Sequence, residues 1–478
     1  MQDLAKQAGT WKWGLLCLLF LAPFFFLSYG FANQYASQLA NVPVIVFEWE
    51  KLIPLWPWTI VPYWSIDLFY GLSLILCWNK FELRQHVLRL FTAQIISISC
   101  FLLFPLRFSF ERPELSGFFG LWFDVLMGFD KPFNQAPSLH IVLLIILWDF
   151  FRRHSQGWTR KFVDFWSLLI GLSVLTTWQH HFIDIPTGIL VGALCLWLFP
   201  MTHKSPFKKD QYQKLTPKHL KLGLYYLIPS LALSTIAFYF KGAFLWFIYP
   251  AVSLLLVSLS YFFARPHFFQ KQSDGTLSHA SLILYAPYLI FAWVNSRIWT
   301  KKHSEDSKIV VLDNLEIYLG RIPDHDSSLH YQGLFDCCAE LPIAHENHSL
   351  KTLKSNYQQY LSLDLIPVQA NQLAQAVSQF DLLFADLQSA KEHLLDDVSN
   401  ISHHQKSNFE NRKLLIFCAL GYSRSSAVLC AWLLKNMHVD SVQHAIEMIQ
   451  TARPWIVIND AQLKQLQLYH FKLKGLAP

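Results

Sequence analysis

A cysteine and an arginine, Cys418 and Arg424, are separated by five residues in the segment KLLIFCALGYSRSS. The apolar run Leu414–Phe417 predicts a strand before the cysteine, and the Arg-Ser-Ser that follows is typical of a helix start. Gly421 stands in the middle of the loop between them. Such a loop directs backbone N–H groups inward and adds the positive end of a helix dipole, so it predicts a phosphate site.

The residue types in this segment favour covalent phosphate chemistry. The field of the loop would lower the pKa of Cys418 and make it a nucleophile, and Arg424 would bind two phosphate oxygens in its planar fork. The Ser425 hydroxyl would hydrogen-bond the sulfur and ease its departure from a phosphocysteine. The backbone of the loop would hold the phosphate, at Ala419, Leu420, Gly421, Tyr422 and Ser423. The alternative is a buried cysteine that serves only as a small hydrophobic residue.

The segment resembles the active-site loop of the dual-specificity branch of the protein tyrosine phosphatase superfamily, His-Cys-x-x-Gly-x-x-Arg-Ser, with Phe417 in place of the histidine. The resemblance implies an α/β domain that hydrolyses phosphomonoesters, with a general acid upstream of the cysteine. Asp364 in YLSLDLIP is the candidate, and Asp381 and Asp386 are weaker ones because they lie on a predicted helix. Since the family's histidine braces the loop, a non-catalytic module that binds phosphorylated lipids or proteins is the alternative.

Composition divides the chain into two parts. Its 478 residues are 53% hydrophobic and only 15% charged, which excludes an ordinary soluble protein. Apolar runs near 20 residues long fill the sequence up to about Trp299, and a pattern typical of a soluble α/β domain follows Lys301. The net charge of +6 is attributed to membrane orientation, and nothing indicates a nucleic-acid partner. The eight cysteines show neither metal-ligand nor disulfide spacing, and no cofactor is expected.

The apolar runs predict eight membrane helices and one interfacial or re-entrant segment, His279–Trp299. The eight predicted spans are Trp13–Phe31, Ile60–Trp78, His86–Phe104, Ser138–Phe151, Phe162–Thr177, Phe182–Phe199, Leu222–Phe240 and Phe244–Phe263. If the last segment also crosses, the chain has nine spans.

Basic residues orient this array, because cytoplasmic loops carry an excess of Lys and Arg. They gather in alternate loops, at Lys80, Arg84, Arg152, Arg153, Arg160, Lys161, Lys204, Lys208, Lys209, Lys214, Lys218 and Lys221. The N-terminus and, with eight spans, the C-terminal domain are therefore predicted to be cytoplasmic, in a compartment that keeps Cys418 reduced. The loops 32–59, 105–137 and 178–181 then face outward.

Two polar clusters lie at the outward ends of predicted spans, Pro137-Ser-Leu-His140 and His180-His-Phe-Ile-Asp184. His180 and Asp184 are four residues apart and would share one face of a helix. A carboxylate on one imidazole nitrogen leaves the other free to attack phosphorus. His140 and the Ser138 hydroxyl, at a helix start, suit a general acid and a phosphate contact. Interfacial histidines that only face water and headgroups are the alternative.

These clusters resemble the motifs of the type 2 phosphatidic acid phosphatase (PAP2) superfamily, Pro-Ser-Gly-His and Ser-Arg-x5-His-x3-Asp. The resemblance implies His180 as the nucleophile, His140 as the proton donor and Asp184 as the orienting carboxylate. The family's Lys-x6-Arg-Pro motif survives as Arg112-Pro113, so Arg112 is a phosphate-binding candidate. Val174 replaces the arginine of the second motif and Leu139 a glycine, as in the branch that transfers phospho-headgroups between lipids, so hydrolase and transferase both stay open.

The predicted fold is a multi-span all-α membrane domain, with a PAP2-like six-helix core plus extra helices, followed by a soluble α/β dual-specificity phosphatase domain. The expected divisions are residues 1–205 (motif core 60–200), additional helices 206–300, a linker 301–307 and the phosphatase domain 308–478. Within the last, strands are expected at Lys308–Leu312, Glu316–Leu319 and Tyr360–Leu365, and helices at Asn371–Leu387, Arg424–Met437, Ser441–Thr451 and Asp460–Lys472. Residues 388–412, which are polar, are expected to be a solvent-exposed insertion.

This arrangement resembles bacterial inner-membrane proteins that fuse the two phosphatase types. The resemblance implies a multi-pass enzyme of the inner membrane whose PAP2-like site faces the periplasm. The expected partners are the bilayer and a phospholipid or phosphorylated lipid, with no metal at either site. The sequence does not indicate an oligomeric state.

Overall fold

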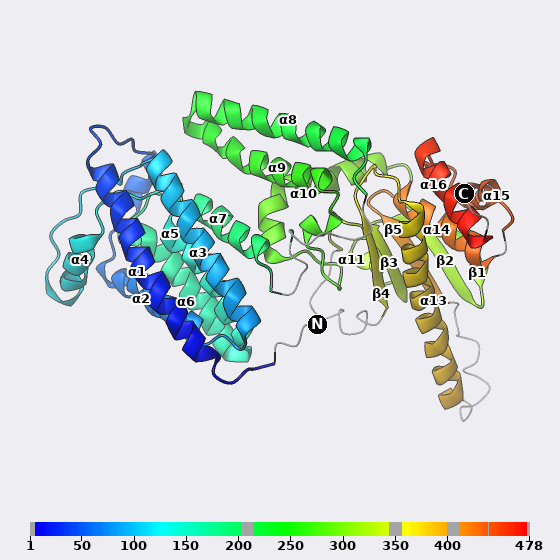
Figure 1. The fold of residues 1–478 in the computed structure, drawn as a ribbon, viewed down its shortest axis with the longest axis horizontal. Helices are drawn as coiled ribbons and strands as arrows, with labels where there is room; N and C mark the ends of the chain where they lie inside the picture. The colour runs from blue at the N-terminus through cyan, green and yellow to red at the C-terminus, as the bar shows by residue number, and fades with distance from the viewer. Residues whose placement is uncertain are drawn as a thin grey trace. The chain divides into compact units, whose positions relative to one another are not determined.

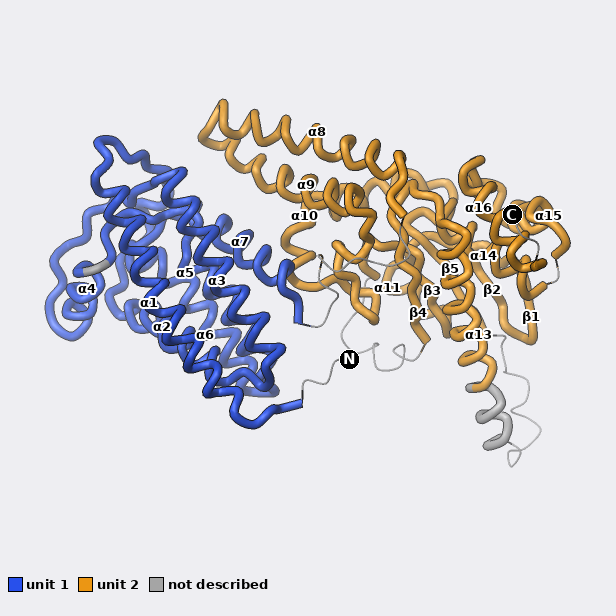
Figure 2. The backbone as a smooth tube through the Cα atoms, in the orientation of Figure 1, with its two compact units in different colours: residues 1–205 blue, residues 206–478 orange. Residues whose placement is uncertain are grey.

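The computed structural model describes residues 5–201, 206, 214–343, 356–398, 412–437 and 439–475. The chain forms two compact units, Met1–Ser205 and Pro206–Pro478 (Figure 2). Lys204, Lys208, Lys209 and residues 399–411 of the predicted insertion lie outside the described residues.

The first unit is helical (Figure 1). Its elements are α1 (Thr10–Ser37), the 3-10 helices η1 (Glu48–Leu52) and η2 (Pro57–Thr59), α2 (Ile60–Ile75), α3 (Lys80–Leu103), α4 (Gly117–Phe129), α5 (Leu139–His154), α6 (Gly157–Thr176) and α7 (Asp184–Leu198). Helix α4 corrects one prediction, because the segment 105–137 was expected to be a loop. Its 13 residues are too few to cross a bilayer, which is why the search for long apolar runs passed over it.

Helices α5 and α7 pack closely, and this contact brings two predicted site residues together. A Cβ at Gly188 of α7 would lie 2.8 Å from Cβ of Ile141 on α5, so only glycine permits the observed approach. The Ser138 amide, just before α5, also donates to the carbonyl oxygen of Asp184, the first residue of α7, at 3.2 Å. The starts of the two helices, which carry His140 and Asp184, are therefore adjacent.

The opposite end of α5 is fixed by ion pairs. Arg89 of α3 donates to Asp149 at 2.7 Å, and Arg153 donates to Glu82 at 2.7 Å. Glu82 and the Arg89 side chain are almost fully buried, and a buried pair that loses one partner leaves an uncompensated charge. These contacts hold α5 against α3 at the end distant from His140.

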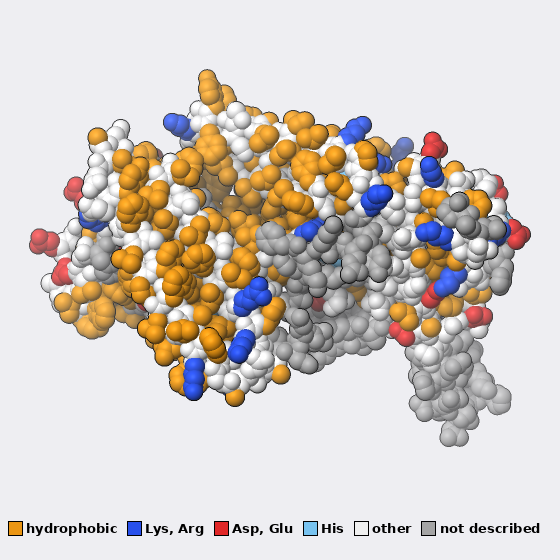
Figure 3. Space-filling model, viewed as in Figure 1, with side chains coloured by type: hydrophobic (Ala, Val, Ile, Leu, Met, Phe, Trp, Pro, Cys, Tyr) orange, Lys and Arg blue, Asp and Glu red, His pale blue; other side chains and the backbone are white. Residues whose placement is uncertain are grey.

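Among the described residues, four helices are long and apolar enough to cross a membrane: Thr10–Ser37, Lys80–Leu103, Pro217–Phe240 and Gly242–Phe262. The other predicted spans form helices of 15 to 20 residues, and the predicted interfacial segment forms a helix of 21 residues. Large apolar side chains lie on the surface of the first unit, as the space-filling view shows (Figure 3), and Leu27 and Phe20 are 74% and 61% exposed. Apolar surface of this extent indicates contact with lipid or protein.

The second unit begins with a layer of apolar helices: α8 (Pro217–Phe240), η3 (Gly242–Phe247), α9 (Ile248–Phe262), η4 (Pro266–Phe269) and α10 (His279–Trp299). We refer to residues 217–299 as the helical layer. Helices α8 and α9 form a tight hairpin, because Gly223 allows the Phe262 ring to approach and the Ser258 hydroxyl donates to the Gly223 carbonyl at 2.8 Å.

A five-stranded sheet follows, in the order β1-β2-β5-β3-β4. Its strands are β1 (Ser307–Leu312), β2 (Leu315–Arg321), β3 (Gly333–Cys338), β4 (Tyr357–Ser362) and β5 (Arg412–Cys418). Strands β1 and β2 pair antiparallel, and the pairs around β5 are parallel. The residues Leu414–Phe417 of β5 are fully buried, as expected for a central strand with both faces covered. The strand therefore delivers Cys418 to the carboxyl edge of the sheet.

The remaining helices of this unit are α11 (His325–Ser328), α13 (Ala370–Val398), α14 (Arg424–Asn436), α15 (Val442–Ala452) and α16 (Asp460–Leu473). Helix α14 packs on β5, and α13 packs on β3 and β4 (Figure 1). Phe380 of α13 and Trp432 of α14 are buried against each other with ring centroids 5.3 Å apart. This core holds the start of α14, and with it Arg424, in place.

Lys271, between η4 and α10, joins the helical layer to the sheet. Its ammonium donates to the carbonyl oxygens of Cys338 at 2.7 Å and Leu341 at 2.6 Å, and it forms an ion pair with Asp336. Both charged side chains are fully buried. The helical layer therefore supplies a core residue to the end of β3.

Three sequence expectations for this unit need correction. Strand β3 was not predicted, because its six residues include the charged Asp336. The strand expected at Tyr360–Leu365 is β4, Tyr357–Ser362, and the chain turns after it, with a φ of 59° at Leu365. The predicted insertion at 388–412 is not entirely loop, because α13 continues through Val398.

Candidate active site

The loop between β5 and α14 forms a closed turn around Cys418. Gly421 has a φ of 71°, in the left-handed region that favours glycine. A Cβ at this position would lie 2.2 Å from the carbonyl oxygen of Gly320 on β2. Glycine is therefore required both by the turn and by the close approach of the neighbouring strand.

The Cys418 sulfur receives hydrogen bonds from two sides. The Gly421 amide and the Ser425 hydroxyl each donate to it at 3.3 Å. Burial raises the pKa of the thiol, but the charge of Arg424 and these hydrogen bonds lower it by more, so the pKa lies below its ordinary value. The sulfur is thus stabilised as a thiolate, the form that attacks phosphorus.

Arg424, at the start of α14, holds two carboxylates. Its two terminal nitrogens donate to the two oxygens of Glu340 at 2.8 Å and 2.6 Å, and one of them lies 3.1 Å from an oxygen of Asp364. The Arg424 side chain is only 4% exposed. Its guanidinium also donates to the Ser362 carbonyl at 2.9 Å, so its fork is fixed beside the loop before any substrate binds.

Glu340 was not identified from the sequence. It follows β3 directly and is buried, whereas Glu is almost never buried without a partner. Its contact with Arg424 joins residues 84 positions apart. The sequence offered one signal, the position of Glu340 just after an apolar strand, at the carboxyl edge of the sheet. That signal could not be used, because β3 itself was not predicted.

Asp364 lies in the turn after β4. Partial burial raises its pKa; the Arg424 charge opposes this shift and the Glu340 carboxylate adds to it, and the net pKa is above the ordinary value. Its side chain remains 43% exposed, so a substrate can reach it. The weaker candidate Asp381 lies elsewhere, on α13, where it accepts hydrogen bonds from Trp432 and Lys435.

Arg453, after α15, braces the loop of residues 418–424, which we call the catalytic loop, and was also missed. Its Nε donates to the Gly421 carbonyl at 3.0 Å, and a terminal nitrogen donates to the Glu305 carbonyl at 3.0 Å. The side chain is fully buried. Phe417, which stands where the resemblance places a bracing histidine, is buried in β5, so Arg453 supplies support to the loop from another direction.

The first unit contains a separate cavity that includes both predicted histidines. Its lining residues are Phe25, Phe26, Tyr29, Tyr63, Trp64, Ile66, Asp67, Leu126, Asp130, Leu139, His140, Leu143 and His180. His180 Nδ1 lies 3.1 Å from Asp184 Oδ2, and the His140 ring stacks on Tyr63 with centroids 4.1 Å apart. One correction concerns the first pair: Asp184 begins α7 and His180 lies in the turn before it, so they share no helix face.

The predicted phosphate contacts of this unit have protein partners. The Ser138 hydroxyl caps α5 by accepting from the Ile141 amide at 3.3 Å. The Arg112 guanidinium lies over the Phe123 ring, 5.5 Å from its centroid. With the Gln179 amide in its hydrogen-bonding orientation, the two terminal nitrogens of Arg112 donate to the Gln179 side-chain oxygen at 3.2 Å and 3.1 Å, so Arg112 lies next to the residue that precedes His180. Its role as a phosphate contact stays a prediction.

Asp130, which the sequence analysis did not single out, lies in this cavity. It accepts from the Tyr29 hydroxyl at 2.9 Å and from the Asn33 amide at 3.3 Å, and it is buried. Buried carboxylates need such donors. No spacing rule links Asp130 with residues about 100 positions earlier, so the sequence offered no signal.

Comparisons with known proteins address the second unit. Residues 341–472 match the family model of the dual specificity phosphatase catalytic domain, and no curated protein matches the chain. A crystal structure of PTPMT1 is 19% identical and covers 36% of this chain and 97% of its own, with a TM-score of 0.25. A leucine-rich-repeat and phosphatase-domain protein from Entamoeba histolytica is 13% identical; the match covers 37% of this chain and 97% of that protein's chain, with a TM-score of 0.25. A variant of human DUSP28 is 17% identical; the match covers 36% of this chain and 97% of the DUSP28 chain, with a TM-score of 0.24.

The family match includes the strand, loop and helix that carry Cys418 and Arg424, as well as Asp364. It begins after residue 340, so the resemblance of residues 60–200 to membrane phosphatases stays a prediction. The match identifies a domain of this type in the second unit and supports a phosphatase that acts on phosphoesters. The C-terminal part of the chain contains a dual-specificity phosphatase catalytic domain.

Proposed function

We propose that the second unit hydrolyses phosphomonoesters of membrane lipids through a phosphocysteine. The observation that carries the proposal is the Cys418 sulfur, held by an amide and a hydroxyl 3.3 Å away beside a fixed guanidinium. The thiolate attacks phosphorus, and the bond to the leaving oxygen breaks as Asp364 protonates that oxygen. Water, deprotonated by Asp364, then attacks the phosphocysteine, and Ser425 stabilises the departing thiolate.

Arg424 stabilises the equatorial phosphate oxygens in both steps. In the resting site one of its nitrogens is shared between Glu340 and Asp364. A bound phosphate replaces Asp364 as the partner of that nitrogen. The Asp364 carboxyl is then free to protonate the leaving oxygen. Glu340 keeps the guanidinium in plane throughout. The mechanism requires no metal or cofactor.

The helical layer supports a lipid as the source of the phosphate. Tyr422 of the catalytic loop donates to the carbonyl oxygen of Trp299, at the end of α10, at 3.0 Å. Trp299 itself is 65% exposed, and exposed tryptophans are typical of the bilayer interface. The catalytic loop is therefore tied to an apolar segment, at a place where lipid headgroups meet the protein if that layer lies in a membrane.

The test uses the full chain in detergent micelles. Purified protein is expected to release phosphate from an aryl phosphate in a vanadate-sensitive manner, and Cys418→Ser is expected to abolish this release. Preference for a phosphorylated lipid over a phosphotyrosine peptide would support the lipid assignment. Preference for the peptide would make the domain a protein phosphatase, and binding without hydrolysis would leave a non-catalytic phosphate-binding module.

A second candidate function belongs to the first unit. Its support is the cavity that contains both His140 and His180, with Asp184 at 3.1 Å from His180. His180 attacks a lipid phosphate or phospho-headgroup, Asp184 orients its ring, and His140 protonates the leaving oxygen. We place this site at the outward face of a bacterial inner membrane, with the N-terminus and the second unit in the cytoplasm.

Hydrolysis and headgroup transfer are distinguished with a labelled phospholipid and the Cys418→Ser variant, which leaves only the site in the first unit. Release of labelled free phosphate supports a hydrolase. Label on a second lipid supports a transferase. If folded protein forms neither product, both activities of the first unit are excluded.

A further inference from the structure

Asp364, the proposed general acid of the second unit, lies in the loop after β4 and so outside the hydrogen-bonded sheet. Strand β4 ends at Ser362, and we call residues 362–369 the acid loop. Leu365, next to Asp364, has a φ of 59°. A branched residue in this left-handed region is strained, so the loop keeps its shape only if neighbouring residues hold it.

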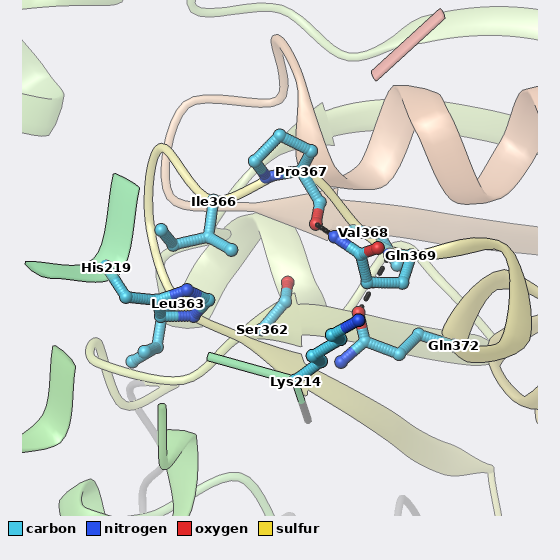
Figure 4. Close-up of a pocket in the computed structure, with 9 residues that line it drawn as sticks. All are labelled: Lys214, His219, Ser362, Leu363, Ile366, Pro367, Val368, Gln369 and Gln372. Carbon is cyan, nitrogen blue, oxygen red and sulfur yellow. Dashed lines mark hydrogen bonds between the residues drawn. The ribbon is translucent and has the colours of Figure 1, made fainter. Parts of the chain in front are cut away.

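The far end of the acid loop is held from within the phosphatase domain. Gln462 of α16 accepts from the Val368 amide at 2.8 Å and donates to the Val368 carbonyl at 3.1 Å. The backbone amide of the next residue, Gln369, donates to the side-chain oxygen of Gln372 at 2.8 Å, as Figure 4 shows. These contacts lie four and five residues beyond Asp364.

The near end is held by the helical layer. The Tyr261 hydroxyl, at the end of α9, donates to the carbonyl oxygen of Asp364 at 3.1 Å. Tyr261 is 2% exposed and stacks on Tyr226 of α8 with centroids 5.5 Å apart. Tyr226 in turn meets Tyr288 of α10 edge-on at 5.9 Å. The hydroxyl is thus fixed by rings from all three helices of the layer.

The first turn of α8 also lies beside the acid loop. His219 lines a small pocket together with Leu363 and Ile366, which flank Asp364 on either side, and Figure 4 shows its ring beside these two side chains. His219 is itself buried, and its Nδ1 lies 2.8 Å from the Thr216 hydroxyl. The acid loop therefore faces α8 across this small pocket and is hydrogen-bonded to α9.

We infer that Tyr261 is a positioning residue for Asp364 and that the helical layer is part of the phosphatase site. The inference rests on the proposed phosphocysteine mechanism. Tyr261 does not touch the reacting atoms; its hydrogen bond fixes the peptide that carries the general acid. Without that bond Asp364 spends less time in reach of the leaving oxygen, and reactions that depend on proton donation slow most.

The test compares substrates that differ only in their leaving group. In the full chain, Tyr261→Phe is expected to lower kcat/KM for phenyl phosphate about five- to tenfold, from the loss of one hydrogen bond. Its effect on p-nitrophenyl phosphate is expected to stay within about twofold, because nitrophenolate leaves without a proton. Asp364→Asn should show the same dependence on the leaving group with a larger loss.

Tyr285→Phe is the matched control. Tyr285 is fully buried in the same layer, but its hydroxyl donates to the carbonyl of Phe268, away from the acid loop. It should leave both rates unchanged. A double variant, Tyr261→Phe with Asp364→Asn, should be no slower than Asp364→Asn alone, because the tyrosine acts only through the carboxyl.

The outcomes separate the two proposals. If Cys418→Ser retains the wild-type rates, the phosphocysteine mechanism itself is wrong. If hydrolysis depends on Cys418 but Tyr261→Phe affects both substrates equally, or neither, the positioning role is wrong and the mechanism stands. An equal leaving-group effect in Tyr285→Phe would also overturn it, since loosening of the layer alone would then explain the loss.

Discussion

The two candidate sites are built in different ways. In the second unit the groups that face phosphate come from one loop of consecutive residues, Cys418 to Ser425, tied to a central strand and a helix. In the first unit His140 lies on α5 and His180 in the turn before α7, and the cavity around them also includes Asp130. A site on one loop can be recognised from a single short motif. A site assembled from separate elements offers only separate short motifs, such as those at His140 and His180, and further members such as Asp130 depend on tertiary packing.

The largest expected effect is a separation of the two activities. Cys418→Ser should lower the activity of the second unit by about 1,000-fold or more and leave that of the first unchanged, and His180→Ala should do the reverse. Phosphate release from an aryl phosphate and turnover of a labelled phospholipid report the two sites separately. Loss of both activities in either single variant would mean that the sites act as one.

Arg424→Lys sharpens the comparison by removing fork geometry while keeping the charge. We expect a fall in kcat/KM of about 100- to 1,000-fold, because a lysine cannot bind both Glu340 and two phosphate oxygens. A steady-state assay with an aryl phosphate measures the loss, and a thermal melt shows whether the domain remains folded. A change of less than threefold would contradict a bidentate role.

The pH dependence distinguishes the thiol from the carboxyl. The lowered pKa of Cys418 lets activity rise with pH below the ordinary thiol range, as the thiolate forms. The raised pKa of Asp364 then makes activity fall at higher pH, as the general acid loses its proton, so kcat/KM should be bell-shaped. Asp364→Asn should lower the maximum about 100-fold and remove the falling limb. A falling limb that persists in this variant would assign it to another group.

Arg453→Met is expected to affect catalysis less than the Cys418, Arg424 and Asp364 variants do. It removes hydrogen bonds to the carbonyls of Gly421 and Glu305 but no group that meets substrate. We expect a loss of stability of about 2–3 kcal/mol and a fall in activity of about tenfold, because the loop loses a support. Denaturant unfolding followed by tryptophan fluorescence measures the first. Unchanged stability and activity would show that the catalytic loop does not need this brace.

The contiguous parts of the second unit were predictable. The apolar run Leu414–Phe417 indicated a buried strand, and the spacing from Cys418 to Arg424 indicated a loop and a helix; β5 and α14 match both. The structure also brings Asp364 to 3.1 Å from Arg424, although 60 positions separate them. The roles of these residues in catalysis stay predictions until the variants are measured.

The supporting residues were not predictable. Glu340 follows a strand that alternation and apolar runs did not reveal, and Arg453 looks like any arginine at the end of an amphipathic helix. Tyr261 lies in an apolar run that was assigned to a membrane span, where an aromatic residue carries no signal for catalysis. In each case the partner is a carbonyl or a side chain far away in the sequence, and only the tertiary packing specifies it.

The buried Lys271 makes the stability of the sheet depend on the helical layer. A phosphatase domain cut free at residue 301 would keep Asp336 inside its core without the cation that neutralises it. An uncompensated buried charge costs about 3–5 kcal/mol, a large share of the roughly 5–15 kcal/mol that holds a typical domain together. The sheet and the helical layer are therefore expected to be stable only together, as a single cooperative module.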